Sequence, residues 1–206
     1  MRQRFLLDAG WSICSAPAAS SEAPSGQARW LPIREAAPVA AALRERGEWS
    51  LDAPPVDFDA SDWWYRLRFD RPPLARDTDV VLGFDGLATL AQVQCNGTPL
   101  PASDNMFVRS EHDITRLLRD RGNELLIRCC ALGAELARRR PRPRWRTPMV
   151  AHQQLRWFRT TLLGRTPGWS PPAAVVGPWR PVWLAQGGVI DPADLQLDIS
   201  VEGGAG

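Results

Sequence analysis

Hydrophobic and polar residues alternate in several short segments of the chain, and this alternation predicts half-buried β-strands. Within residues 62–69 the side chains on one face are large and apolar, namely Trp63, Tyr65, Leu67 and Phe69. Residues 90–96 alternate small apolar with polar side chains, and residues 80–84 are apolar throughout. Further strands are expected at 5–8, 11–14, 30–33, 124–130 and 177–184. The pattern therefore predicts a chain built mainly from short strands.

Turn residues separate these segments at short intervals. Asn96-Gly97 lies between two strand-like runs and predicts a type I′ hairpin, because both central residues of that turn need positive φ. Gly122-Asn123 marks another turn. Two helices are expected, at 39–46 before Gly47 and at 153–163 before Gly164. Short strands divided in this way favour an all-β antiparallel sandwich with long loops over alternating βαβ units.

Composition narrows the class of protein. A chain of 206 residues with 44% hydrophobic content can bury a sizeable core, and a net charge of +2 gives no general attraction to nucleic acid or to an acidic membrane. All 25 basic residues are Arg, and residues 138–146 form a Pro-interrupted basic run around Trp145. Such a run is typical of nucleic-acid backbone binding, but a solvated loop is favoured because the whole chain is nearly balanced in charge.

The cysteines and the N-terminal residues argue against a metal site and a secretory signal. Cys14, Cys95, Cys129 and Cys130 lack metal-ligand spacing, only two His are present, and buried free thiols are expected without metal or cofactor. Asp8 interrupts the apolar run of residues 5–7 before it reaches the length of a secretory signal. No window approaches the roughly 18 apolar residues of a membrane span. We expect a cytoplasmic protein without membrane or nucleic-acid partners, and a periplasmic or secreted location stays open.

A series of motifs resembles the N-terminal sugar-binding domain of family-two glycoside hydrolases. The series consists of 64–69, 82–87, Val93 with 96–97, 105–107, 113–115, 122–125, and Gly177 with 179–182. The resemblance covers roughly residues 5–186 and implies a jelly-roll β-sandwich of the galactose-binding type. Asn105-Met106-Phe107 is similar to the N-M-F of the β-mannosidase branch, where β-galactosidases and β-glucuronidases tend to have a Gly-Gly-aromatic segment.

The chain departs from the β-mannosidase pattern ahead of Trp179. That branch carries W-D-W-G-P, in a loop that reaches the mannose pocket of a neighbouring barrel. Counting back from Trp179 places Trp169 at the second Trp of this motif and Pro171 at its Pro. Pro167 and Gly168 then stand in place of the first Trp and the sugar-binding Asp. Arg159 falls on the Arg of an R-K-x-Q element whose Lys and Gln are replaced. The resemblance thus implies a divergent member with altered sugar contacts.

Catalytic residues are not expected in this chain. A retaining glycosidase needs two carboxyl groups about 5 to 5.5 Å apart, and the family holds both on a downstream barrel. Asn123-Glu124 matches the acid/base dipeptide of the family, but it lies at a turn that opens a strand. Asp85 and Asp113 stand beside turn residues and are interpreted as turn and capping carboxylates. We see no catalytic triad and no phosphate loop.

Trp169, Arg159 and Trp157 are the candidate substrate-binding residues, because a Trp face stacks on the C–H surface of a sugar ring. Packing in a core or between domains is the favoured alternative for both Trp residues. Trp11, Trp63, Trp179 and Trp183 occupy strand positions and are expected in the core.

Together these observations predict a sugar-binding β-sandwich over residues 1–186, followed at 187–206 by a linker and the truncated start of an immunoglobulin-like domain. The resemblance implies the non-catalytic first domain of an exo-glycosidase that removes terminal non-reducing β-D-mannose. The domain would support the active-site rim of a downstream barrel. The alternatives are a stand-alone carbohydrate-binding module and the same domain of a β-galactosidase-like or β-glucuronidase-like enzyme.

Overall fold

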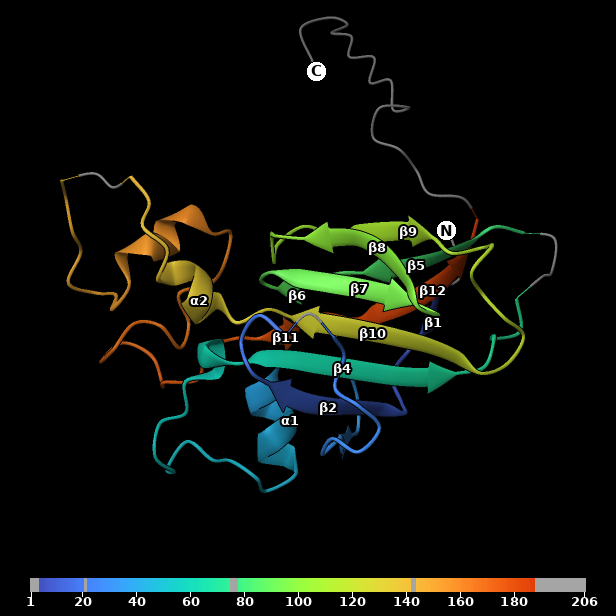
Figure 1. The fold of residues 1–206 in the computed structure, drawn as a ribbon, viewed down its shortest axis with the longest axis horizontal. Coiled ribbons are helices and arrows are strands. Elements are labelled where there is room, and N and C mark those ends of the chain that lie inside the picture. Colours follow the sequence, from blue (N-terminus) through green and yellow to red (C-terminus); the bar gives the residue numbers. More distant parts are fainter. Residues whose placement is uncertain (1–3, 21, 75–77, 142–143, 188–206) are drawn as a thin grey trace, which may run out of the picture.

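The computed structural model describes residues 4–20, 22–74, 78–141 and 144–187. Within them, two antiparallel sheets pack face to face as a β-sandwich (Figure 1). The larger sheet has the order β3 (Leu31–Ile33), β2 (Trp11–Ala16), β4 (Asp62–Phe69), β10 (Asn123–Cys129), β7 (Ala91–Cys95) and β8 (Thr98–Ser103). The smaller sheet has the order β1 (Arg4–Leu6), β12 (Val182–Gln186), β5 (Val80–Phe84) and β9 (Ser110–Asp113). The predicted all-β sandwich is confirmed.

Short elements complete the described chain. A two-stranded sheet pairs β11 (Gly177–Pro178) with β6 (Leu87–Ala88). The helices are α1 (Val39–Glu45) and α2 (Leu132–Leu136), with 3₁₀ turns η1 (Phe58–Ala60) and η2 (Gln153–Trp157). None of the helices in the described ranges has the length and apolar character needed to cross a bilayer. The predicted immunoglobulin-like start lies, beyond Gly187, outside the described residues.

Alternation along the strands builds the core between the sheets. Every second residue of β10 is buried, and Ile127 pairs with Tyr65 of β4 on one side and Val93 of β7 on the other. Tyr65 is fully buried, and its hydroxyl donates to the Ala37 carbonyl at 2.8 Å. Burial also raises the pKa of this phenol well above its ordinary value. Each large apolar side chain sealed in this way contributes about 1.5–3 kcal/mol.

The Asn96-Gly97 hairpin is confirmed. Asn96 and Gly97 have φ of 51° and 82°, as a type I′ turn requires, and they connect β7 to β8. The Asn96 amide also binds beyond its own turn, donating to the Leu117 carbonyl at 2.7 Å and accepting from Glu124 N–H at 2.8 Å. The turn is therefore tied to the segment that enters β10.

Of the four tryptophans expected in the core, Trp11, Trp63 and Trp183 are buried in core clusters and Trp179 is not. Trp11 and Trp63 lie between the sheets as expected. Trp183 is buried but on the outer face of the smaller sheet, where it lies across Gly83 and the Arg4 guanidinium stacks on its ring at 4.1 Å. Trp179 is only half-buried. The Trp179 indole N–H donates to the Met106 carbonyl and the Trp183 indole N–H to Asp85. Alternation along β12 directs Val182 and Leu184 to the inter-sheet core and Trp183 to the opposite face.

The helix predicted at 153–163 is wrong beyond its first turn. Only η2, a 3₁₀ turn, forms, and residues 158–163 have no helical structure. The cause is a tertiary pairing: Arg159 forms an isolated bridge with Asn105, and its carbonyl accepts from Met106 N–H at 3.1 Å. A carbonyl that accepts a hydrogen bond from a distant segment is not available to accept the intrahelical N–H. The helix at 39–46 is confirmed as α1, and its successor Gly47 has φ of 70°.

The cysteine prediction is confirmed for the thiols that the structure describes. Cys14, Cys95 and Cys129 are buried, Cys130 is half-buried, and all four are free. Burial raises the pKa of the Cys129 thiol far above its ordinary value, so this group stays protonated and inert.

Candidate functional site

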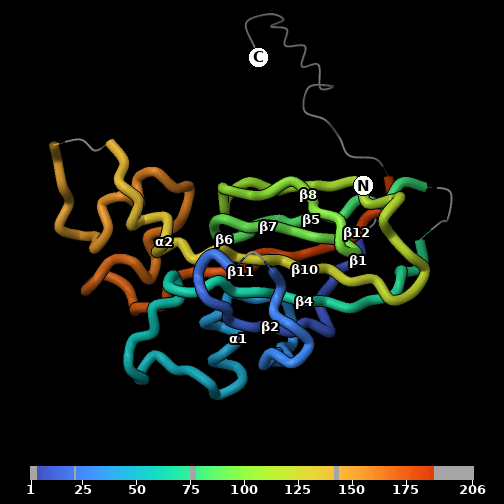
Figure 2. Tube along the Cα trace, in the orientation of Figure 1, coloured from blue at the N-terminus to red at the C-terminus, as the bar shows by residue number. Residues whose placement is uncertain are grey.

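Segments far apart in the sequence meet at one end of the sandwich. Figure 2 traces residues 132–141 and 144–175 as an excursion from the sheets at this end. We define the rim as residues 105–107, residues 158–170 and Trp179. The Trp179 indole N–H donates to the Met106 carbonyl at 2.8 Å, and its ring lies so close to Gly86 that any Cβ there would collide with it. The fold thus joins the motifs that carried the resemblance.

Met106 holds the rim together through three of its atoms. Its N–H and carbonyl bind Arg159 and Trp179, and its sulfur accepts from Thr161 N–H at 3.0 Å. The side chain is 2% exposed. The adjacent Phe107 is 57% exposed and meets the Trp179 ring edge-on at 6.3 Å. The N-M-F motif therefore positions an exposed aromatic ring by burying the residue before it.

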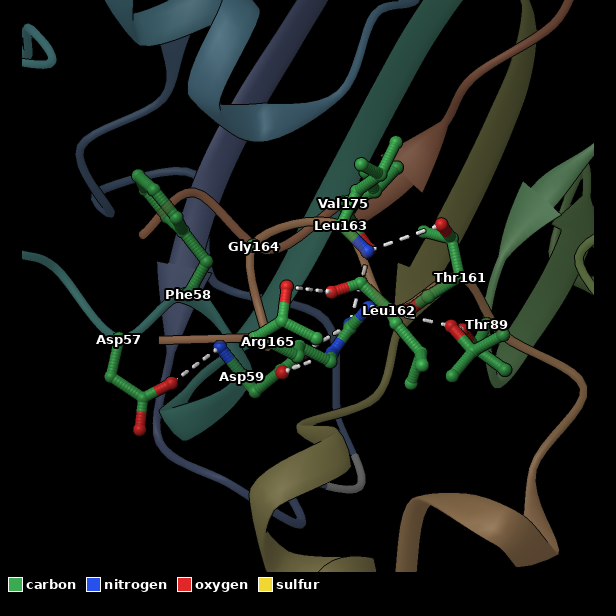
Figure 3. Close-up of polar contacts among 12 residues, drawn as sticks. Asp57, Phe58, Asp59, Thr89, Thr161, Leu162, Leu163, Gly164, Arg165 and Val175 are labelled. Carbon is green, nitrogen blue, oxygen red and sulfur yellow. Dashed lines mark hydrogen bonds and ion pairs between the residues drawn. The ribbon is translucent and has the colours of Figure 1, made fainter. Parts of the chain in front are cut away.

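A buried ion pair anchors the long loop of the rim (Figure 3). The Arg165 guanidinium donates from Nε and Nη2 to the two Asp59 carboxylate oxygens at 2.7 and 2.8 Å. It also donates to the carbonyls of Thr161 at 3.0 Å and Val175 at 3.3 Å. Both charged side chains are nearly inaccessible, at 6% and 10% exposure. The pair ties η1 to two segments of the loop.

Close backbone approach and hydroxyl contacts fix the remainder of the loop. Gly164 has φ of 80°, and a Cβ there would lie 2.2 Å from the Ala173 carbonyl oxygen. Its N–H donates to the Ser170 hydroxyl at 2.9 Å. The Thr160 hydroxyl forms a short hydrogen bond with that of Thr89, which links the loop to the end of β6. Only glycine fits at position 164.

A mainly apolar cavity of about 390 Å³ opens between η1, α2 and the rim. Phe58, Leu136 and Leu155 line it together with Pro167 and Ser170. Its volume falls within the range of about 300–1,000 Å³ typical of small-molecule sites. The cavity places a binding-sized hollow directly beside the loop that carries Trp169.

A family model described as "Glycosyl hydrolase 2 galactose-binding domain-like" matches residues 23–180. The match spans most of the chain, including the rim and all strands except β1, β2 and β12. The chain belongs to this family.

Two curated relatives of this family-two domain share a name. The chain is 34% identical over 134 residues to "Beta-mannosidase B" of Thermothelomyces thermophilus, covering 60% of this chain and 15% of the relative. It is 28% identical over 201 residues to "Beta-mannosidase B" of Aspergillus fumigatus, covering 88% of this chain and 22% of the relative. The chain thus spans less than a quarter of the length of the relatives it matches.

Solved structures of family-two enzymes share the fold. A β-D-mannosidase from Dictyoglomus thermophilum superposes with a TM-score of 0.61 at 22% identity, over 88% of this chain and 22% of the other. A family-two β-glucuronidase superposes with a TM-score of 0.56 at 18% identity, over 90% and 18%. At these identities the likeness establishes the β-sandwich alone.

The predicted sugar-binding residues of this family-two domain lie on or beside the rim and are exposed. Trp169 is 74% and Trp157 51% exposed, and the Trp157 indole N–H donates to the Pro141 carbonyl at 3.2 Å. The Arg159 side chain is exposed, while its backbone pairs with residue 105. Gly168 and the exposed Pro167 stand in the turn before Trp169, whose N–H donates to the Thr166 carbonyl. Their role in binding sugar stays a prediction.

The ion pair that anchors the rim has no local signal in the sequence. Asp59 lies in a Pro-rich connection and Arg165 in a loop without periodicity, so neither stood out among 23 acidic and 25 basic residues. Thr160 and Thr161 fell inside the predicted helix and were assigned no contact. A buried Arg is recognisable only when its carboxylate partner is known.

The other carboxylates considered for chemistry have structural contacts. Glu124 opens β10 and pairs with Arg68 at 3.2 Å. Asp113 accepts from the Thr115 hydroxyl and N–H, and these hydrogen bonds lower the pKa of the carboxyl group. Asp85 is more than a turn residue, because it accepts from the Trp183 indole at 3.0 Å and pairs with Arg109 at 2.9 Å. Across the described ranges, His, Cys, Asp and Glu form no group suited to a metal ion.

Proposed function

We propose that this chain is the non-catalytic N-terminal domain of a β-mannosidase-like exo-glycosidase that removes terminal non-reducing β-D-mannose. Its rim would support the active site of a downstream catalytic barrel. The observation that carries the proposal is the N-M-F segment packed under Trp179, together with relatives named β-mannosidase B. The short share of those relatives that the chain spans fits a domain that works within a longer protein.

The surface around the rim supports a partner on this face. The exposed large hydrophobic side chains between residues 145 and 169 are Trp145, Met149, Trp157, Leu162, Leu163 and Trp169. Phe107 and Val108 add to them from the N-M-F side. We propose that these side chains contribute to a protein or ligand interface, since a gathering of exposed apolar residues is typical of one. A barrel docked on this surface would cover these side chains. The edges of the aromatic rings would remain to line the sugar site.

The activity is tested on the full parent protein and on the 206-residue chain. We expect the parent to hydrolyse an aryl β-mannoside in preference to the corresponding β-galactoside and β-glucuronide, and the isolated chain to hydrolyse none of them. A parent that prefers the β-glucuronide would refute the assignment to the mannosidase branch. Turnover by the isolated chain would refute the non-catalytic role.

The rim is tested in the parent by Trp169→Ala. Loss of a ring that stacks on sugar should raise KM for the β-mannoside by about three- to tenfold, since such contacts are worth about 0.5–1.5 kcal/mol. Trp30→Ala is the matched control, because Trp30 lies beside β3 and stacks on Arg66. Equal effects of the two substitutions on KM would show that Trp169 acts only through general stability.

A further inference from the structure

Figure 1 shows where β10 ends and leads into α2. A second cavity is lined by residues of this region, on the outer face of the larger sheet. It measures about 500 Å³. Arg128 and Gln92 line it from paired positions of β10 and β7, and Ala102 and Ser103 line it from β8. We call it the sheet-edge cavity. None of its lining residues belongs to the rim or to the rim's cavity.

A fixed guanidinium forms part of its wall. Arg128 donates from Nε and Nη2 to Asp62 Oδ2 at 2.9 and 2.7 Å. Asp62 is itself held by the N–H groups of Ala131 at 2.7 Å and Ser20 at 3.2 Å. The two side chains are only 11% and 1% exposed. This arrangement fixes the guanidinium before any ligand arrives, which removes the entropy cost of ordering a long side chain.

Hydrogen-bonding capacity is left over on the cavity side. Of the five N–H groups of Arg128, two bind Asp62 and one on Nη1 donates to the Gln92 amide oxygen at 3.1 Å. One N–H on each terminal nitrogen is therefore free among the contacts of the described residues. Gln92 and Ser103 also line the cavity, and the Ser103 hydroxyl donates to the Asn105 carbonyl at 3.5 Å. Planar side chains that carry hydrogen-bond donors and acceptors next to one another can bind neighbouring hydroxyl groups of one ligand.

The charges around the cavity select against ions. Its charged lining consists of the carboxylates of Asp62, Asp104 and Glu135 and the guanidiniums of Arg128 and Arg138. An anion would meet more carboxylates than guanidiniums, and both guanidiniums are already paired with acids. A metal ion lacks a suitable ligand group in the part of the chain that the structure describes. A neutral, polar ligand fits this balance best.

The geometry points to a second binding site, in which the sheet-edge cavity takes a neutral polyhydroxy compound such as one or two sugar rings. Arg128 and Gln92 bind adjacent hydroxyls, and the partly exposed Leu90 contacts the C–H surface of the ring. The site goes beyond the proposed function, because it acts apart from the rim and needs no barrel. It gives the domain an attachment point for a longer glycan.

The proposal is tested by NMR titration of the ¹⁵N-labelled 206-residue chain with mannobiose, cellobiose and sodium sulfate. We expect saturable shifts of the Gln92 side-chain amide and the Ser103 N–H with at least one disaccharide, at a Kd in the millimolar range. Sulfate should leave these signals in place. Gln92→Ala should weaken binding about three- to tenfold, as loss of a hydrogen bond predicts. Ala102→Trp, which fills the exposed mouth, should abolish it.

Gln94→Ala is the matched control, because Gln94 lies on the same face of β7, two residues away and outside the cavity. The Gln94→Ala chain should bind the disaccharide with the same affinity as the unaltered chain. The proposal is overturned if neither disaccharide gives saturable shifts, if Gln92→Ala and Gln94→Ala behave alike, or if sulfate shifts the same signals. These outcomes leave the mannosidase assignment untouched, since that rests on turnover by the parent.

Discussion

Removing the Arg165 guanidinium tests how the rim is held. In Arg165→Met the Asp59 carboxylate keeps its buried position but loses two charge-assisted hydrogen bonds of 2.7 and 2.8 Å. The carbonyls of Thr161 and Val175 lose a donor as well. Breaking a buried pair by removing one partner costs about 3–5 kcal/mol, because the remaining charge stays desolvated. We therefore expect the free energy of unfolding to fall by about that amount.

Urea denaturation followed by tryptophan fluorescence measures the effect on the 206-residue chain. With a slope near about 3 kcal/mol per molar urea, as expected at the upper end for small domains, the midpoint should fall by about 1–2 M. Arg68→Met is the matched control, because Arg68 pairs with Glu124 while its side chain is 72% exposed. An exposed pair of this kind contributes about 0–1 kcal/mol.

A double variant separates the charge from the packing. Arg165→Met combined with Asp59→Leu removes both charges and fills the space with apolar atoms, so it should recover much of the stability lost by either single change. A midpoint for Arg165→Met that matches Arg68→Met would refute the reasoning. A double variant less stable than the sum of the two singles would also refute it, since the pair would then act through packing alone.

Two further substitutions test the sandwich. Gly83→Ala should unfold the smaller sheet or cost several kcal/mol, because its Cβ would lie 2.1 Å from the Trp183 ring; a melting temperature within about 2 °C of the unaltered chain would contradict this. Burial lowers the pKa of His112, which packs against Phe84, so the unfolded chain binds the proton more tightly. Stability should therefore fall as pH drops below about 6.5, by at most about 1.4 kcal/mol per pH unit, and this part of the loss should be absent in His112→Phe. Parallel urea midpoints for both chains between neutral pH and pH 5 would exclude His112 as the cause.

Local rules account for most of the β-sandwich. The alternation at 62–69 follows from the two-residue period of a strand, and it places Tyr65 and Leu67 in the core wherever the partner strands come from. Asn96-Gly97 forces a reversal because few residue pairs tolerate positive φ at both positions. The motif resemblance likewise needs only the order of residues along the chain. These features were therefore available from the sequence.

The candidate site needed contacts between distant residues. Asp59 and Arg165 are 106 positions apart, and nothing local in either segment marks them as partners. The bridge between Asn105 and Arg159 replaces the helix that the pattern at 153–163 predicts. The sheet-edge cavity depends in the same way on the pairing of Arg128 with Asp62 across neighbouring strands.

The sequence by itself determined the strands, the hairpin and the family, because side-chain period and backbone φ preferences act within a few residues. Only the tertiary structure decided which exposed rings share the rim and which charges are buried in pairs. The physical reason is desolvation: excluding water from Asp59 and Arg165 costs free energy, and their attraction offsets this cost only where the fold brings the two groups together and satisfies their remaining hydrogen bonds. That exclusion is a property of the assembled fold.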